Sequence, residues 1–141
     1  MENDEIIIHT DGGARGNPGP AACAFVAELS GKTIGKKSLF LGVSTNNCAE
    51  YQGVLLALNW LNENRKNFSA GVVTFYLDSE LVARQLSGKY KVKDKKLMEL
   101  FIRAINLSTK IGLKINYRNI PRAENKNADL LVNEELDKES E

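Results

Sequence analysis

The order in which strand-like and helix-like segments follow one another constrains the fold of this chain most strongly. A β-branched, apolar run and two further strand-like runs come first, and segments with apolar residues at three- and four-residue steps then alternate with more strand-like runs. The expected strands cover residues 6–10, 21–28, 33–42, 72–77 and 113–120, and the expected helices cover 47–65, 81–86, 97–105 and 128–136. This order predicts an α/β fold with a mixed five-stranded sheet, three antiparallel strands followed by parallel ones, flanked by helices.

Length and turn-forming residues define the expected domain organisation. The 141 residues fit one domain, so we expect residues 1–141 to fold as a single unit. Asp11-Gly12-Gly13 predicts a turn that closes the first strand, and Ser30-Gly31 predicts the tight turn of a hairpin. The chain is rich in acids from about Glu134 to Glu141, and we expect this tail to be frayed.

Charge is spread unevenly along a chain of ordinary composition. Hydrophobic residues make up 43% and charged residues 26%, which argues against a disordered chain, and the formal net charge is +1. Between Arg84 and Lys126, however, twelve lysines and arginines stand against three acids, so this segment carries +9 and the remainder −8. No apolar run is long enough to cross a bilayer, and the N-terminus is acidic where a signal peptide would be basic. We expect a cytoplasmic protein without a membrane partner, and a monomer.

Two kinds of site lack support in the sequence. Cys23 and Cys48 have no metal-ligand spacing and are remote from His9, so we interpret both thiols as small buried apolar groups. The run Gly13-Ala14-Arg15-Gly16 offers neither a GxGxxG pattern nor the lysine ending of a Walker loop. The sequence therefore predicts no zinc site, no disulfide and no nucleotide cofactor.

Four acids stand at comparable places in the expected architecture. Asp11 closes the first strand, Glu50 lies in the first turn of the first long helix, Asp78 closes the fourth strand, and Asp129 comes early in the last helix. Each has a local structural explanation. Asp11 could belong to turn chemistry, Glu50 could complete a capping box with Asn47, Asp78 could cap the next helix, and Asp129 could favour its own helix dipole.

Taken together, the four acids favour a metal site. Ligands bind beyond the carboxyl ends of parallel strands, where we expect Asp11 and Asp78 to meet. Like charges so placed repel one another and raise each other's pKa unless a cation is present. Mg²⁺ prefers a few carboxylates together with phosphate oxygens, and a pair of such ions can stabilise the attacking and leaving oxygens of a phosphoryl displacement. Phosphodiester cleavage is therefore the leading chemistry.

Four segments resemble type 1 ribonuclease H, in order and over nearly the whole chain. They are Thr10–Pro20 (TDGGARGNPGP), Thr45–Glu50 (TNNCAE), Leu77–Ser79 (LDS) and Glu124–Asp129 (ENKNAD). The resemblance implies a ribonuclease H-like fold and an endonuclease that cuts the RNA strand of an RNA/DNA hybrid with two Mg²⁺ ions, leaving 3′-hydroxyl and 5′-phosphate ends. Mn²⁺ is the alternative ion, and double-stranded RNA is a further candidate substrate.

The resemblance also assigns roles to individual residues. The family's four catalytic, metal-binding acids correspond to Asp11, Glu50, Asp78 and Asp129. Of these, Asp11 would bridge the ions. The candidate substrate contacts are Asn17, Thr45, Asn46, Asn47, Glu80, Lys89, Lys91 and Arg122. Amide side chains suit the 2′-hydroxyls and base edges of a shallow minor groove, and Thr45 matches a hydroxyl that holds a DNA-strand phosphate. For Asn46 and Asn47, helix capping is the structural alternative.

One departure from the family pattern concerns proton transfer. The segment between Ile120 and Asp129 holds no histidine, where many members carry one that assists proton transfer or product release. Arg122 or Glu124 could substitute in part, although an arginine stays charged and cannot shuttle protons. We therefore expect slower turnover than in members that carry the histidine. The only histidine, His9, is interpreted as a core or supporting residue of the first strand.

Two further departures concern substrate binding. Glu80 stands where many relatives carry a glutamine that contacts the hybrid, and only Ser87–Lys93 occupies the place of a larger basic protrusion. Lys89 and Lys91 form either a small phosphate-contact patch or a solvated turn. These departures leave an alternative open, a nucleic-acid-binding module with this fold and little nuclease activity. A nuclease of the same superfamily that acts on another duplex is a weaker third hypothesis.

Overall fold

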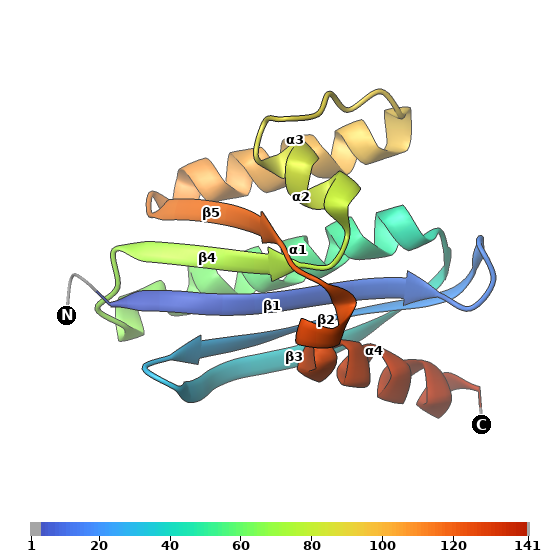
Figure 1. Cartoon of the computed structure of the whole chain (residues 1–141), viewed down its shortest axis with the longest axis horizontal. Helices are drawn as coiled ribbons and strands as arrows, with labels where there is room; N and C mark the ends of the chain where they lie inside the picture. Colours follow the sequence, from blue (N-terminus) through green and yellow to red (C-terminus); the bar gives the residue numbers. More distant parts are fainter. Residues whose placement is uncertain (1–3, 141) are drawn as a thin grey trace.

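The computed structural model describes residues 4–140 and contains a five-stranded sheet. Its strands are β1 (Glu5–Ala14), β2 (Gly19–Leu29), β3 (Lys32–Ser44), β4 (Val72–Leu77) and β5 (Lys114–Asn119). They lie in the order β3-β2-β1-β4-β5 (Figure 1). β2 is antiparallel to β1 and β3, whereas β4 is parallel to β1 and β5. The predicted mixed sheet, with three antiparallel strands followed by parallel ones, is confirmed.

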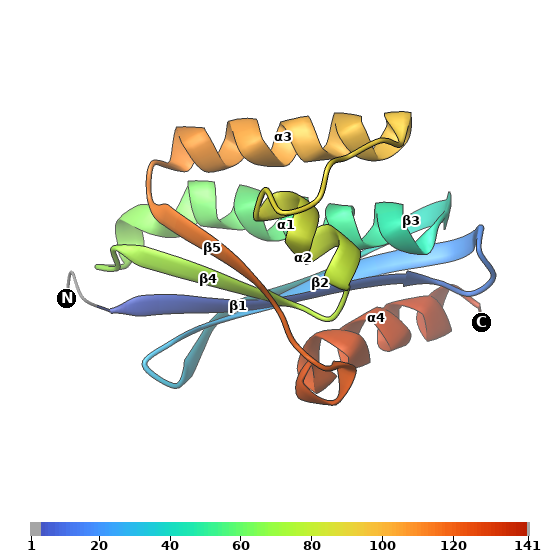
Figure 2. The same ribbon diagram turned by 45° about the horizontal axis from the view of Figure 1, so that its top comes forward.

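Helices cover both faces of this sheet. They are α1 (Asn46–Asn64), α2 (Glu80–Leu86), α3 (Lys95–Ile111) and α4 (Lys126–Glu139), and two short 3₁₀ turns cover Arg65–Asn67 and Arg122–Glu124. α1 packs on β1 and β2 and α3 packs on α1, whereas α4 packs on β1, β2 and β3 from the opposite face (Figure 2). Within residues 4–140, no helix combines the length and the apolar character needed to span a membrane.

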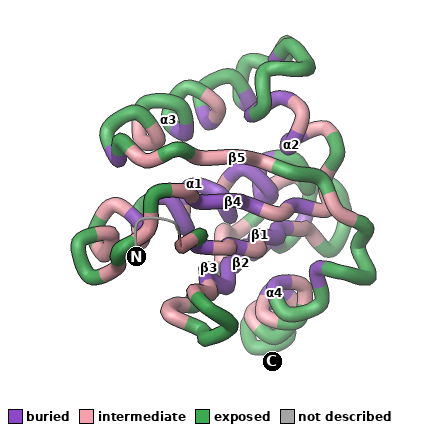
Figure 3. The backbone as a smooth tube through the Cα atoms, turned by 60° about the vertical axis from the view of Figure 1, so that its left-hand side comes forward, coloured by how far each residue is buried: buried purple, intermediate pink, exposed green. Residues whose placement is uncertain are grey.

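The main core lies between the sheet and α1. Alternate residues of β1, Ile6 and Ile8, point toward this helix, together with Phe75 of β4. They meet Leu58 and Leu61 of α1, and all five side chains are at most 1% exposed. Buried residues accordingly concentrate on α1 and the central strands (Figure 3). A smaller cluster on the other face joins Ala22 and Ala24 to Val132 and Leu136.

β1 is longer than expected because it continues through Asp11-Gly12-Gly13. Its pairing with β2 extends to Ala14 opposite Ala21, so the prediction of a turn at the two glycines is wrong. A Cβ atom at Gly12 would lie 2.1 Å from the backbone oxygen of Ala49, and glycine is therefore required for the close approach of α1. The predicted hairpin turn at residues 30–31 is present, with positive φ angles of 52° and 79°.

The last helix also extends further than expected. α4 continues through residue 139, and Leu136 is only 5% exposed because it packs against β2. In the same turn, Ser38 Oγ of β3 donates a hydrogen bond of 2.9 Å to Glu135 Oε1. The expectation of a frayed tail from about residue 134 is therefore wrong for residues 134–139, and residue 141 lies outside the described part of the chain.

Candidate active site

Three acids from distant parts of the chain converge at one edge of the sheet. Asp11 lies on β1, Glu50 lies near the start of α1, and Asp78 directly follows β4. A carboxylate oxygen of each acid lies within 4.8 Å of those of the other two. This follows from the topology, since β1 and β4 are parallel neighbours whose carboxyl ends meet at the same edge.

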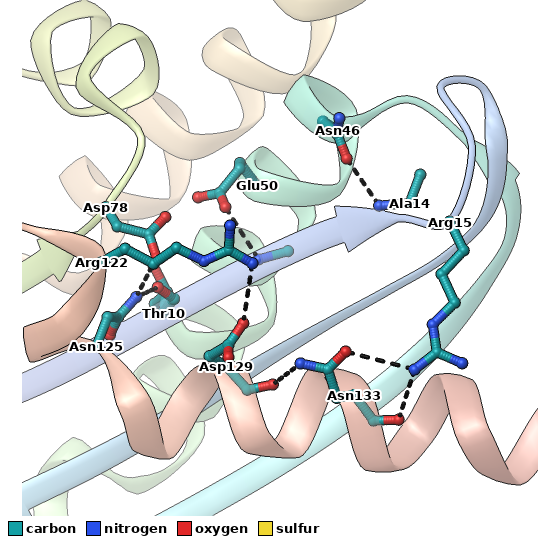
Figure 4. Close-up of polar contacts among 11 residues, drawn as sticks. Thr10, Ala14, Arg15, Asn46, Glu50, Asp78, Arg122, Asn125, Asp129 and Asn133 are labelled. Carbon is teal, nitrogen blue, oxygen red and sulfur yellow. Dashed lines mark hydrogen bonds and ion pairs between the residues drawn. The ribbon is translucent and has the colours of Figure 1, made fainter.

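Asp129 faces the same cleft from the opposite side. The cleft has a volume of about 570 Å³ and is lined by all four acids. Asp129 comes from the first turn of α4 and stands apart from the close group of three. Its carboxylate lies 3.7 Å from the guanidinium of Arg122, a side chain that is 82% exposed and extends over the cleft (Figure 4).

Burial and mutual repulsion raise the pKa of two of these carboxyl groups. Asp11 and Glu50 are each 6% exposed. Loss of hydration raises the pKa of Glu50 well above its usual value, and the negative charges of Asp11 and Asp78 raise it further. Burial is also the main reason that the pKa of Asp11 is raised, and the negative charges of Asp78 and Asp129 raise it further. The fold therefore holds acids where their charge is unfavourable without a positive partner.

One buried carboxylate oxygen of this group is left open. Glu50 Oε1 accepts a hydrogen bond of 3.2 Å from the backbone N–H of Gly12. Glu50 Oε2 is buried as well, but among the described residues it has no hydrogen-bond partner. Carboxylate oxygens are the ligands that Mg²⁺ and Mn²⁺ prefer. The residues present therefore fit a divalent cation.

Local capping does not explain Glu50 or Asp78. The N-cap of α1 is Thr45, whose hydroxyl accepts from the N–H of Cys48 at 3.2 Å, so the capping box is wrong. The N-cap of α2 is Ser79, whose hydroxyl accepts from Val82 N–H at 3.3 Å, so a cap at Asp78 is wrong too. Both acids are free to face the cleft.

The asparagines around the start of α1 connect the glycine-rich loop to this helix. Asn46 Oδ1 accepts from Ala14 N–H at 2.8 Å, and Asn17 Oδ1 accepts from Asn46 N–H at 3.0 Å. The side chains of Asn46 and Asn47 do not cap α1, because the N-cap of this helix is Thr45. Asn46 and Asn47 are exposed and line the cleft. Their remaining amide groups are therefore available to a ligand in the cleft.

Five of the predicted substrate contacts do not line the acid cleft: Asn17, Thr45, Glu80, Lys89 and Lys91. Glu80 forms an ion pair of 3.4 Å with Arg84 and accepts a hydrogen bond of 3.0 Å from the hydroxyl of Tyr90. Lys89 and Lys91 lie exposed in the segment between α2 and α3. Glu80 is therefore engaged with its own helix and the following segment.

Asn125 is a site residue that sequence reasoning missed. It is 1% exposed, and its Nδ2 donates to Thr10 O at 2.8 Å and to Asp78 Oδ2 at 3.3 Å (Figure 4). An asparagine just before a helix reads as an N-cap, yet its side chain makes no capping hydrogen bond. No local pattern signals contacts to residues so distant in sequence.

His9 lies beside the site without lining it. Its ring stacks on Tyr76 with a centroid distance of 5.3 Å and an interplanar angle of 26°. Burial lowers the pKa of His9, and the negative charge of Glu28 opposes this effect. The half-buried stacked ring agrees with the interpretation of His9 as a supporting residue of β1.

Relatives of known sequence match nearly all of the chain. Residues 3–137 match the sequence model of the RNase H family. The chain is 37% identical over 136 residues to the bifunctional protein Rv2228c of Mycobacterium tuberculosis, covering 94% of this chain and 36% of that protein. It is 37% identical over 133 residues to ribonuclease HI of Halobacterium salinarum, covering 94% and 64% respectively. The chain thus spans about a third of the length of the mycobacterial relative.

A solved structure agrees in fold as well. LC11-RNase H1, solved in complex with an RNA/DNA hybrid, superimposes with a TM-score of 0.91 at 40% sequence identity. The match covers 96% of this chain and 99% of that one. Sequence, topology and the placement of the matched segments agree, and this chain belongs to the ribonuclease H family.

Proposed function

We propose that this protein is a metal-dependent ribonuclease that hydrolyses the RNA strand of RNA/DNA hybrids. The observation that carries the proposal is the group formed by Asp11, Glu50 and Asp78, with Asp129 on the facing wall. A protein that only bound nucleic acid would have no physical need for buried, mutually repelling carboxylates that disfavour a polyanion. The structure of LC11-RNase H1 with such a hybrid supports the substrate class.

The four acids would hold one or two divalent cations, Mg²⁺ or Mn²⁺. When bound, such ions would supply positive charge near the attacking and leaving oxygens of the phosphodiester. The expected products carry 3′-hydroxyl and 5′-phosphate ends. Asp11 would hold metal together with Glu50 and Asp78, since a carboxylate oxygen of each lies within 4.8 Å of those of the other two. The backbone N–H of Gly12 and the amide of Asn125 fix the orientation of Glu50 and Asp78.

Other residues of the chain would bind and orient the duplex. Asn46 and Asn47 line the cleft, and Asn17 and Thr45 hold the loop and helix end that present them. Amides in this position suit the 2′-hydroxyls and base edges of a hybrid minor groove. Arg122 extends over the cleft and can pair with a phosphate, but it holds its proton and cannot act as an acid or base.

A cleavage assay tests the proposal directly. Labelled RNA/DNA hybrid, double-stranded RNA and double-stranded DNA are incubated separately with the protein and Mg²⁺, Mn²⁺ or EDTA, and the product ends are identified. We expect cleavage of the RNA strand of the hybrid only with a metal ion. Asp78→Asn should reduce the rate by ~100-fold or more, whereas Glu63→Gln, an exposed carboxyl on the far part of α1, should leave it unchanged. Hydrolysis of DNA duplex alone would contradict the substrate assignment.

The same assay distinguishes the nuclease from the alternative of a nucleic-acid-binding module with little activity. The absence of a histidine between residues 120 and 129 favours this alternative. Tight hybrid binding without cleavage in either metal would support the module. Cleavage of double-stranded RNA would add that duplex to the substrates. A cytoplasmic location and a monomeric state complete the proposal, and the latter is checked by light scattering.

A further inference from the structure

A basic hollow lies beside the acid cleft, between α2 and the end of β5. Its volume is about 340 Å³. Three cationic residues line it, Arg84, Lys89 and Arg118, together with polar groups that include Ser87 and Asn119. None of the described residues that line this basic hollow is acidic.

Two of the three cations have no anionic partner among the described residues. Arg84 is engaged, since it forms an ion pair with Glu80 and lies 5.5 Å from the ring centroid of Tyr90. Lys89 and Arg118 are exposed, and within residues 4–140 neither forms an ion pair. Uncompensated positive charge around a concave surface attracts an anion, and both arginine and lysine bind phosphate groups.

The basic hollow adjoins the acid cleft along two strands. Tyr76 of β4 lines the hollow and Asp78, two residues further along the chain, lines the cleft, a separation of about 7 Å in extended backbone. On β5, Asn119 lines the hollow and its Nδ2 donates to Leu77 O at 3.2 Å, next to Asp78. A distance of about 7 Å corresponds to roughly one step between adjacent phosphates of a strand, because the ~3.4 Å spacing per nucleotide is measured along the duplex axis.

We propose that the basic hollow is a second contact site for the sugar-phosphate backbone of the nucleic-acid strand whose phosphodiester lies in the acid cleft. Arg118 and Lys89 bind a phosphate about one nucleotide from the cleaved bond and so position the strand along the cleft. This inference rests on the proposed function. A nucleic acid is favoured over an acidic peptide because the strand already held in the cleft has a backbone phosphate at this spacing.

The test uses RNA/DNA hybrids in which a short block of ribonucleotides fixes the cleavage position. Two series are truncated stepwise, one from each end, toward that position. Three proteins are compared: wild type, Lys89→Ala/Arg118→Ala, and the matched control Lys32→Ala/Lys36→Ala, which removes two exposed lysines at the β2–β3 end of the sheet. The charge-retaining variant Lys89→Arg/Arg118→Lys tests rescue.

On long hybrids, we expect Lys89→Ala/Arg118→Ala to raise KM by about 5–10-fold with kcat within twofold, and the control to match wild type. The slope of log K against log salt should fall by about 1–2, one contact per side chain. Truncation from one end should raise the wild-type KM and remove the difference between wild type and variant. The charge-retaining variant should restore most of the affinity.

An unchanged KM on long hybrids, or an increase that persists on duplexes too short to reach the hollow, would overturn the inference. Binding of the same duplexes, measured by fluorescence anisotropy in EDTA, gives an independent readout. If wild type cleaves no hybrid, the proposed function fails. The salt dependence of binding still tests the role of the basic hollow in that case. Equal slopes of log K against log salt for wild type and Lys89→Ala/Arg118→Ala would contradict this role whether or not cleavage occurs.

Discussion

Glu50 illustrates how one carboxyl group can be unfavourable for stability and still suit a binding site. It is buried beside Asp11 and Asp78, and within the described part of the chain only one of its oxygens has a hydrogen-bond donor. Without a cation, this arrangement retains the repulsion and the loss of hydration. With a divalent cation bound, both are offset, so binding energy is available to stabilise the folded state.

Glu50→Gln should separate these two effects. The amide keeps the shape and the acceptor for Gly12 N–H but removes the buried charge. In EDTA we expect the variant to unfold about 3–5 °C above wild type, the equivalent of roughly 1 kcal/mol. Adding Mg²⁺ should raise the midpoint of wild type and leave that of the variant nearly unchanged. Calorimetry measures both, and an equal Mg²⁺ response of the two proteins would contradict the metal assignment.

Replacing Asn125 should affect both stability and cleavage. Asn125→Ala removes the hydrogen bonds to Thr10 O and Asp78 Oδ2 and leaves the buried Thr10 carbonyl without this donor. We expect the free energy of unfolding to fall by about 1–3 kcal/mol, measured by urea denaturation. Hybrid cleavage should fall as well, because Asp78 loses a group that fixes its orientation. Wild-type stability in this variant would show that the contact is dispensable.

Only part of this site could be predicted from the sequence. The meeting of Asp11 and Asp78 follows from strand order alone, because parallel neighbouring strands end at the same edge. The role of Asn125 could not be predicted, since its contacts join α4 to β1 and to the end of β4. The structural role of a glycine is ambiguous in the sequence for a related reason. At Gly12, turn formation and close helix approach require the same residue, and only the packing of Ala49 distinguishes them.

At the scale of elements, α4 is the helix that the sequence described least well. Its acidic composition favoured a frayed tail, but the helix covers β1, β2 and β3 and carries Asp129 to the cleft. One apolar position per turn is enough to hold it, because the facing surface of β2 consists of small alanines that let the helix approach closely. Local propensity does not reveal such a partner surface.

Leu136 should therefore be more important than a tail residue would be. Leu136→Ala removes a buried side chain from the small cluster between α4 and β2, and we expect a loss of about 2–4 kcal/mol in unfolding free energy. Leu130→Ala is the matched control on the same helix, since Leu130 is 56% exposed, and it should change stability by less than about 0.5 kcal/mol. Urea denaturation compares the two, and equal effects would mean that α4 is not held by this contact.

At the scale of the whole molecule, charge and function are separated along the chain. The basic segment between Arg84 and Lys126 contributes the cations of the hollow and Arg122 at the cleft, whereas all four acids of the cleft come from the acidic remainder. A net charge of +1 conceals this arrangement. Hybrid binding should therefore depend on salt as it does in a basic protein, since counterions are released locally at the phosphates that are bound.

The stability of the whole molecule should decline in alkaline solution, partly through Tyr117. Burial raises the pKa of Tyr117 to about 12, although its hydrogen bond with Ser108 acts in the opposite direction. Above pH ~10 the unfolded chain releases this proton while the folded protein keeps it, so ionisation favours unfolding until about pH 12. The contribution is fully present below pH ~10 and is lost at up to ~1.4 kcal/mol per pH unit above it.

Tyr117→Phe isolates this contribution. At pH 8 the variant should lose about 1 kcal/mol, because the 3.0 Å hydrogen bond between Ser108 Oγ and the Tyr117 hydroxyl is absent. Between pH 9 and 11 its unfolding free energy should decline less steeply than that of wild type, so that the two curves converge. Tyr51, whose pKa is also raised by burial, accounts for part of the decline that remains. Parallel curves over this range would mean that Tyr117 titrates alike in the folded and unfolded states.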